Sequence, residues 1–202
     1  MTAEERIFSI VRGGLYAKLP SLALPLGRLT CREGKVDPAG TDGEAAVFAP
    51  GLLRREFLAE SDLPERLTLH LLLHLMLGHP WGRQGRARAL WDTACDLAVG
   101  LVRHALLPQE PETPAAFSAR CKLQARRAVR APAIYALLLE QPDALTAEEQ
   151  AAFYLDDHRL WQLSASASAP KTADGGAETG WQALGRKLPD PLPLKPVIGS
   201  GS

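Results

Sequence analysis

Three of the five histidines fall within ten residues, at positions 70, 74 and 79. His70 and His74 are four residues apart in the leucine-rich run LHLLLHLMLGHP. Residues four apart on a helix differ by about 40° in azimuth and lie one above the other, so both imidazoles can face one ion. Imidazole nitrogens bind zinc at about 2.0–2.1 Å. The spacing therefore indicates a metal site, and it leaves open whether His79, which follows Gly78, takes part.

The alternative is that His70 and His74 are core histidines with hydrogen-bonded rings. Most H-x-x-x-H patterns have such a structural role. Here, however, the surrounding helix is apolar nearly all round and is expected to be buried. Two buried imidazoles without partners would cost several kcal/mol, which a metal or a carboxylate for each ring would offset. Both interpretations stay open on this pattern alone.

A third ligand is needed, and Asp96 is the best candidate. It lies 22 residues beyond His74 in the apolar stretch ACDLAV, and an acid in such a setting requires a cation or a strong donor. Asp92, one helical turn earlier, is either an alternative ligand or an acceptor for a ring N–H. Cys95 is interpreted as an ordinary buried thiol.

The residue after His70 is Leu71, where the zinc-peptidase signature H-E-x-x-H has glutamate. That glutamate acts as general base, and a leucine cannot take a proton. Loss of a general base typically costs about 10²–10⁴-fold in rate. A substitute base would have to come from elsewhere, with Asp157, Glu60 and Asp92 as candidates.

The elements that must position these residues are mostly helical. Apolar periodicity and capping signals predict helices over 3–18, 51–60, 63–77, 86–106, 131–141 and 146–163. Two short strands, 27–33 and 44–48, flank a turn-rich segment and are expected to form a hairpin beside the buried histidine helix. The predicted fold class is α+β.

The chain divides by composition near residue 163. Residues 1–163 are expected to form one domain. Residues 164–202 begin with SASASAPKTADGGAETG and continue as a proline-rich stretch ending in GSGS, so we expect a flexible linker and tail.

Composition excludes several classes of protein. The formal net charge is zero, so the basic run from Arg120 to Arg130 is interpreted as a solvated helix face and nucleic-acid binding is not expected. The sequence contains no apolar run of membrane-spanning length, and its start does not have the pattern of a signal peptide. Three widely spaced cysteines favour a reduced, cytoplasmic protein.

Four motifs in order resemble one family, the metallopeptidase domain at the N-terminus of bacterial VWA-like proteins (the DUF2201 N-terminal family). GTDGEAAVFAP resembles its T-D-G loop and strand, and LHLLLHLMLGHP its H-E-x-x-H-x-x-L-G-H-P helix. WDTACDLAVG resembles its W-N-I-A-x-D-x-x-I-N helix, and DDHRLW its D-D-H-x-x-W motif. Three positions depart from the family pattern: Leu71 replaces the glutamate, and Asp92 and Gly100 replace asparagines.

The resemblance implies a zincin-like fold with zinc held by His70, His74 and Asp96. It implies that Asp157 and His158 line the same cleft and orient substrate. It also implies a protein partner, either a VWA-domain protein or a MoxR-type AAA+ ATPase. With Leu71 in place of the base, we expect a zinc-binding domain that is catalytically impaired and binds peptides or proteins, with strand 44–48 as an edge for an added peptide strand. The alternative is an active metallopeptidase with a non-standard base.

Overall fold

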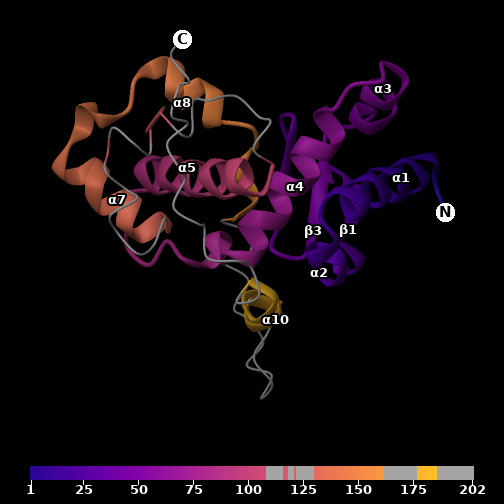
Figure 1. Ribbon diagram of the computed structural model, residues 1–202, viewed down its shortest axis with the longest axis horizontal. Coiled ribbons are helices and arrows are strands. Elements are labelled where there is room, and N and C mark those ends of the chain that lie inside the picture. Colours follow the sequence, from indigo (N-terminus) through magenta and orange to yellow (C-terminus); the bar gives the residue numbers. More distant parts are fainter. Residues whose placement is uncertain (108–115, 118–120, 122–129, 162–176, 186–202) are drawn as a thin grey trace, which may run out of the picture.

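The computed structural model describes residues 1–107, 116, 117, 121, 130–161 and 177–185 (Figure 1). Helices dominate it, and the fold class is α+β, as predicted. The α-helices are α1 (Ala3–Lys18), α2 (Ala23–Arg28), α3 (Leu52–Leu58), α4 (Leu63–Met76), α5 (Arg88–Leu106), α7 (Ala131–Glu140), α8 (Ala147–Phe153) and α10 (Ala177–Gly185). Short 3-10 turns are η1 (Pro20–Leu22), η2 (His79–Trp81), η4 (Pro142–Ala144) and η5 (His158–Leu160). No helix in these described ranges has both the length and the apolar character of a membrane span.

The sheet has three short strands in the order β1-β3-β2: β1 (Thr30–Glu33), β2 (Ala39–Thr41) and β3 (Ala45–Phe48). The predicted strands form β1 and β3, but the predicted hairpin between them is wrong, because β1 and β3 run parallel. The antiparallel partner of β3 is β2, which lies in the segment expected to be a turn-rich loop. A tight turn joins β2 to β3, with Gly43 at φ 96° and Asp42 Oδ1 accepting from the Ala45 N–H.

The central position of β3 removes the expected peptide-binding edge. Both sides of β3 are paired, so segment 44–48 cannot take up a further strand. The edge strand nearest the histidine helix is β2. Its Ala39 carbonyl accepts the N–H of Asp157 at 2.7 Å, so the segment carrying Asp157 already occupies part of that edge.

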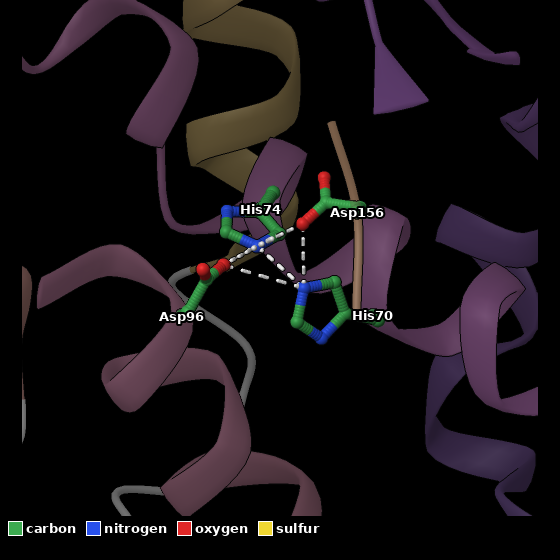
Figure 2. A group of neighbouring side chains, drawn as sticks. All are labelled: His70, His74, Asp96 and Asp156. Atoms are coloured by element: carbon green, nitrogen blue, oxygen red, sulfur yellow. Dashed lines mark hydrogen bonds and ion pairs between the residues drawn. The ribbon is translucent and has the colours of Figure 1, made fainter. Parts of the chain in front are cut away.

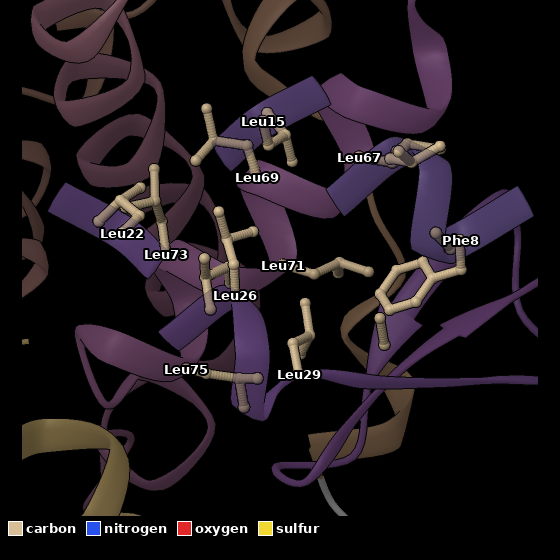
Figure 3. Close-up of a cluster of buried hydrophobic side chains, with 14 of the residues drawn as sticks. Phe8, Leu15, Leu22, Leu26, Leu29, Leu67, Leu69, Leu71, Leu73 and Leu75 are labelled. Carbon is tan, nitrogen blue, oxygen red and sulfur yellow. The ribbon is translucent and has the colours of Figure 1, made fainter. Parts of the chain in front are cut away.

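Helix α4 passes through the middle of the structure (Figure 1). The sheet, α1 and α3 lie on one side of it, and α5, α7 and α8 lie on the other. Its leucines join Phe8, Leu15 and other residues of α1 and α2 in one core cluster (Figure 3). Pro64 lies in its first turn, and Gly78, at φ 72°, follows its end. Because every residue from Leu67 to Met76 is buried, α4 is a rigid support for its two histidines.

Helix α5 packs against α4 and belongs mainly to a second core cluster with α7, Phe153 and Trp161. Helix α8 begins with a complete capping box, in which Thr146 Oγ1 accepts from the Glu149 N–H and Glu149 accepts from the Thr146 N–H. It ends at Phe153, ten residues before the predicted end. The chain then continues through residues 154–157 to η5, crossing between β2 and α5.

Residues 177–185, which the sequence predicts to be part of a flexible tail, form α10 against α4 and α2. Trp181 is buried in the same core cluster as the α4 leucines, and the Arg28 guanidinium lies 4.8 Å from the centre of its ring. One large aromatic side chain thus anchors a helix within a polar, low-complexity sequence. The domain boundary at residue 163 stays a prediction.

Candidate metal centre

Four buried side chains from three separate segments point at one spot (Figure 2). Their nearest ligand atoms all lie within 4.8 Å of one another and come from His70, His74, Asp96 and Asp156. The two histidines are one turn apart on α4, so their Nε2 atoms lie 2.9 Å apart. Asp96 projects from α5, and Asp156 comes from the extended chain before η5. Asp156 Oδ1 lies 2.9 Å from His70 Nε2, and Asp96 Oδ1 lies 3.4 Å from His74 Nε2.

These spacings fit a small metal ion. A tetrahedral zinc site with metal–ligand distances of about 2.0–2.1 Å has ligand atoms about 3.3–3.4 Å apart. The separations that involve a histidine nitrogen range from 2.9 Å between the two Nε2 atoms to 3.6 Å between His70 Nε2 and Asp96 Oδ1. Asp96 Oδ1 is buried and accepts no well-aligned hydrogen bond from the described residues. The lone pairs of these nitrogen and oxygen atoms converge with too few protons to form hydrogen bonds between all of them, and a cation would satisfy the rest. The four side chains therefore fit a metal ion.

The electrostatics keep both carboxylates ionised. Burial alone would raise the pKa of Asp156, but the charges of His158, His74 and His70 hold it well below its ordinary value of 3.8. Burial would also raise the pKa of Asp96, but the charge of His158 and the nearby rings of His70 and His74 outweigh it and lower the pKa. Both groups are therefore anions at neutral pH, as metal ligands must be.

The two α4 histidines differ in their affinity for a proton. Burial lowers the pKa of His74 to about 4, against the opposing charge of Asp156, so its ring is neutral at pH 7. For His70 burial also favours the neutral ring, but the close Asp156 carboxylate outweighs it and raises the pKa above 6.5. His74 is thus ready to bind a metal at neutral pH, whereas at His70 protons compete with a metal up to a higher pH.

His158 lies beside the same spot. Its Nε2 atom is 2.9 Å from Asp156 Oδ1 and 3.1 Å from Asp96 Oδ1, and its Nδ1 atom is 3.8 Å from Asp92 Oδ1. Its ring stacks on Trp161 with centroids 3.9 Å apart. Burial would lower the pKa of His158, but Asp156 and Asp96 raise it well above 6.5. The geometry places its Nε2 atom as a fifth polar group at the centre.

Asp92, the sequence alternative to Asp96, is not among the four converging side chains. It lies one turn earlier on α5 and forms an ion pair with Arg88 at 3.5 Å. Burial raises its pKa above 3.8, against the charges of His158 and Arg88. Asp92 is therefore placed to support the His158 ring.

The predicted site residues separate into two groups in space. His70, His74 and Asp96 are brought together, and His158 lies against them. Leu71 is fully buried in the core cluster near Phe8 and Leu29, away from the converging donors (Figure 3). Glu60 is exposed between α3 and α4 and does not line the pocket beside the centre. Asp157 lines that pocket, but its carboxylate is held by the Arg159 guanidinium at 2.8–2.9 Å from Nε.

Asp156 is the site residue that sequence reasoning missed. It is the first residue of the DDHRLW motif, in which the family resemblance indicates Asp157 and His158. The backbone near Asp157 is extended, and neighbouring side chains on an extended chain point in opposite directions. Alternation alone does not decide which of the two aspartates faces the centre, because Tyr154, which it places on the same side as Asp156, is exposed. The signal in the sequence is the adjacent pair of acids, and it does not choose between Asp156 and Asp157.

A pocket of about 700 Å³ opens beside the centre. Asp96 and His158 form its inner end, and Asp92 and Thr93 of α5 line one wall. Tyr154, Arg159 and the Asp37–Pro38 segment form much of the rest. This volume is typical of small-ligand sites and can hold a few residues of a peptide.

His79, the third histidine of the cluster, contacts His74 on the side away from the centre. Their Nδ1 atoms are 3.0 Å apart. Burial lowers the pKa of His79 well below 6.5, so its ring is neutral. His104, in contrast, lies in the last turn of α5, outside the cluster.

Residues 14–182 match one family model, described as "putative metallopeptidase domain" (DUF2201_N). The match covers most of the chain and includes α4, α5, η5 and Trp181. The chain belongs to this family, as its motifs predicted. No curated protein and no solved structure matched the chain. Much of the basic run, which the sequence analysis interprets as a solvated helix face, lies outside the described residues, with only Arg130 and Cys121 inside them.

Proposed function

We propose that this domain binds one zinc ion through His70, His74, Asp96 and Asp156 and is impaired as a peptidase. The observation that carries the proposal is that four protein side chains converge on one point and leave no position open for water or substrate. Catalytic zinc sites keep a position open for water or substrate, whereas four protein ligands are typical of structural sites. Here four donors converge and His158 Nε2 lies against two of them. When bound, zinc would supply Lewis acidity to this spot.

The position of Leu71 also supports impairment. Leu71 is fully buried among apolar side chains and offers no proton acceptor to the centre. Neither Glu60 nor Asp157, the two other carboxylates named as substitutes, is available as a base, since Glu60 does not line the pocket beside the centre and Asp157 is bound to Arg159. Without a general base, a hydrolase would lose about 10²–10⁴-fold in rate.

The role we assign instead is binding of a peptide or protein segment in the 700 Å³ pocket. The pocket reaches the centre at Asp96 and His158, so a bound segment can contact the side chains around the ion. Its wall at Thr93 carries a small side chain that leaves space. We propose that the partner is either a VWA-domain protein or a MoxR-type AAA+ ATPase, as the resemblance to the family implies.

The second candidate function is peptide hydrolysis with Asp92 as the base. Asp92 lines the pocket one turn from Asp96, and burial raises its pKa, which suits a proton acceptor. This candidate requires one of the converging donors to leave the ion, and for that reason we place it second.

Metal content tests the proposal. Protein purified without chelator and without a nickel column is analysed by plasma mass spectrometry, as wild type and as His74→Ala, Asp96→Ala and His104→Ala. We expect about one zinc per chain in wild type and in the His104→Ala control, and little in the other two. A metal-free wild type would remove the proposal.

Two further assays separate the candidates. Zinc-loaded wild type should not cleave an unfolded protein substrate, and Thr93→Trp should block peptide binding by filling the pocket. Measurable turnover that disappears in Asp92→Asn would establish the second candidate in place of the first.

A further inference from the structure

His79 is the buried histidine that the proposed zinc ligands do not include. It lies in η2, just after α4, and its ring meets the His74 ring edge-on with centroids 5.0 Å apart. The contact is a hydrogen bond of 3.0 Å between the two Nδ1 atoms. Both rings are buried, so water does not compete with this bond.

The direction of this hydrogen bond follows from proton counting. Two Nδ1 atoms at 3.0 Å can share one proton, which only one of them carries. The Nε2 atom of His74 faces Asp96 and His70 and must present its lone pair to a metal. His74 then carries its proton on Nδ1 and donates it, and His79 accepts through its Nδ1 lone pair.

The acceptor is itself held in place. Gly78 adopts the left-handed conformation that turns the chain after α4, and Pro80 fixes the backbone of the next turn. The indole Nε1 of Trp91, on α5, donates to the His79 carbonyl at 3.4 Å. His79 is therefore anchored to both helices that supply ligands.

We propose that His79 is a positioning residue that fixes the tautomer and ring orientation of His74 and thereby strengthens metal binding at Nε2. The inference rests on the proposed zinc site. Ligating histidines commonly donate their second N–H to a carboxylate or carbonyl, and loss of that partner costs about 10–100-fold in metal affinity. Here a neutral imidazole takes the place of the usual oxygen acceptor.

Zinc affinity of three variants tests the role. His79→Leu removes the acceptor at similar volume, and His79→Asn retains an acceptor, because asparagine Oδ1 can occupy the place of imidazole Nδ1. His104→Leu is the matched control outside the cluster. In competition with a chromophoric chelator, we expect a zinc Kd raised about 10–100-fold in His79→Leu, largely restored in His79→Asn and unchanged in His104→Leu.

A second measurement does not depend on how well the variants fold. In ¹⁵N-labelled, zinc-loaded wild type, the Nδ1 proton of His74 should appear in long-range ¹H–¹⁵N spectra with a coupling to the Nδ1 nitrogen of His79. Detection of that proton on His79, or of no shared proton, would overturn the inference even if zinc binds. Equal zinc affinity in wild type and His79→Leu would also overturn it and leave the proposed function intact. Failure of wild type to bind zinc would remove both.

Discussion

Asp156 Oδ1 lies 2.9 Å from His70 Nε2, although the two residues are 86 positions apart in sequence. The next residue, Asp157, turns its carboxylate to Arg159 and donates its N–H to Ala39 of β2. Two adjacent aspartates thus have different roles. One faces the donor cluster, and the other fastens the segment that carries it.

Replacing these two aspartates separately should affect two different properties, zinc affinity for Asp156 and stability for Asp157. Asp156→Asn removes a charged metal ligand from the centre, and we expect zinc affinity to fall by more than the roughly 100-fold typical of losing a hydrogen-bond partner of a ligand. Asp157→Asn should keep about one zinc per chain and lose only about 1 kcal/mol of stability through weaker contacts with Arg159. Chelator competition measures the first effect and urea unfolding the second. Similar zinc affinity in both variants would contradict the assignment of Asp156.

Restoring the signature glutamate should unfold the protein and not activate it. Leu71 is fully buried among apolar side chains, so Leu71→Glu places a carboxylate in the core. We expect a loss of about 4 kcal/mol or more in the free energy of unfolding. Leu24→Glu, at a leucine that is 66% exposed, is the control and should change stability by less than about 0.5 kcal/mol. A folded Leu71→Glu protein with new peptidase activity would show that residue 71 can reach the metal.

Zinc binding should release protons and strengthen as pH rises. The pKa values of His70 and His158 are raised above 6.5 by Asp156, so both rings hold their protons to a higher pH than a free imidazole does. Below these pKa values protons compete with zinc, and the competition ends as pH rises through them. His74, with a pKa of about 4, contributes no proton at pH 7. Calorimetry in buffers of different ionisation enthalpy should count about one to two protons released. His158→Gln should release about one fewer, and a count of zero in wild type would refute this.

Trp181 should contribute strongly to stability although it follows a low-complexity sequence. It is 1% exposed and packs in the core cluster with the α4 leucines. Trp181→Ala should lose about 3–5 kcal/mol, the usual cost of truncating a buried aromatic residue. Ala183→Lys, at an exposed position of α10, is the control. A chain shortened to residues 1–163 should lose at least as much as Trp181→Ala. Equal stability of the short and full chains would place the domain boundary at residue 163.

The part of the site on helices could be predicted from sequence, because helical periodicity relates neighbours on one face. The i, i+4 spacing placed His70 and His74 together, and the apolar surroundings of Asp96 marked it as a buried acid. The same reasoning predicted α1, α3, α4, α5 and α7 within a few residues.

The rest depended on contacts that no local pattern encodes. Strand β2 is three residues long in a segment rich in turn signals, so neither its existence nor the parallel pairing of β1 with β3 could be read from periodicity. After α8 the chain is irregular, and only its docking on β2 decides which of Asp156 and Asp157 faces inward. Trp181 was missed because a single buried side chain leaves no repeating pattern.

The donors come from three segments, and this has a topological consequence. An ion bound to Asp96 and Asp156 would staple the chain across a loop of about 60 residues, much as a disulfide does. A cross-link of that span lowers the conformational entropy of the unfolded chain, which stabilises the folded state by about 4 kcal/mol in the chain-entropy relation. Because this contribution changes slowly with loop length, by about 0.6 kcal/mol per doubling, the intervening segment can lengthen or shorten with little effect on it. The ion would then act as a reversible clamp, and its departure would leave the Asp156 segment held by the hydrogen bond from Asp157 to Ala39, while α4 and the sheet keep their own core.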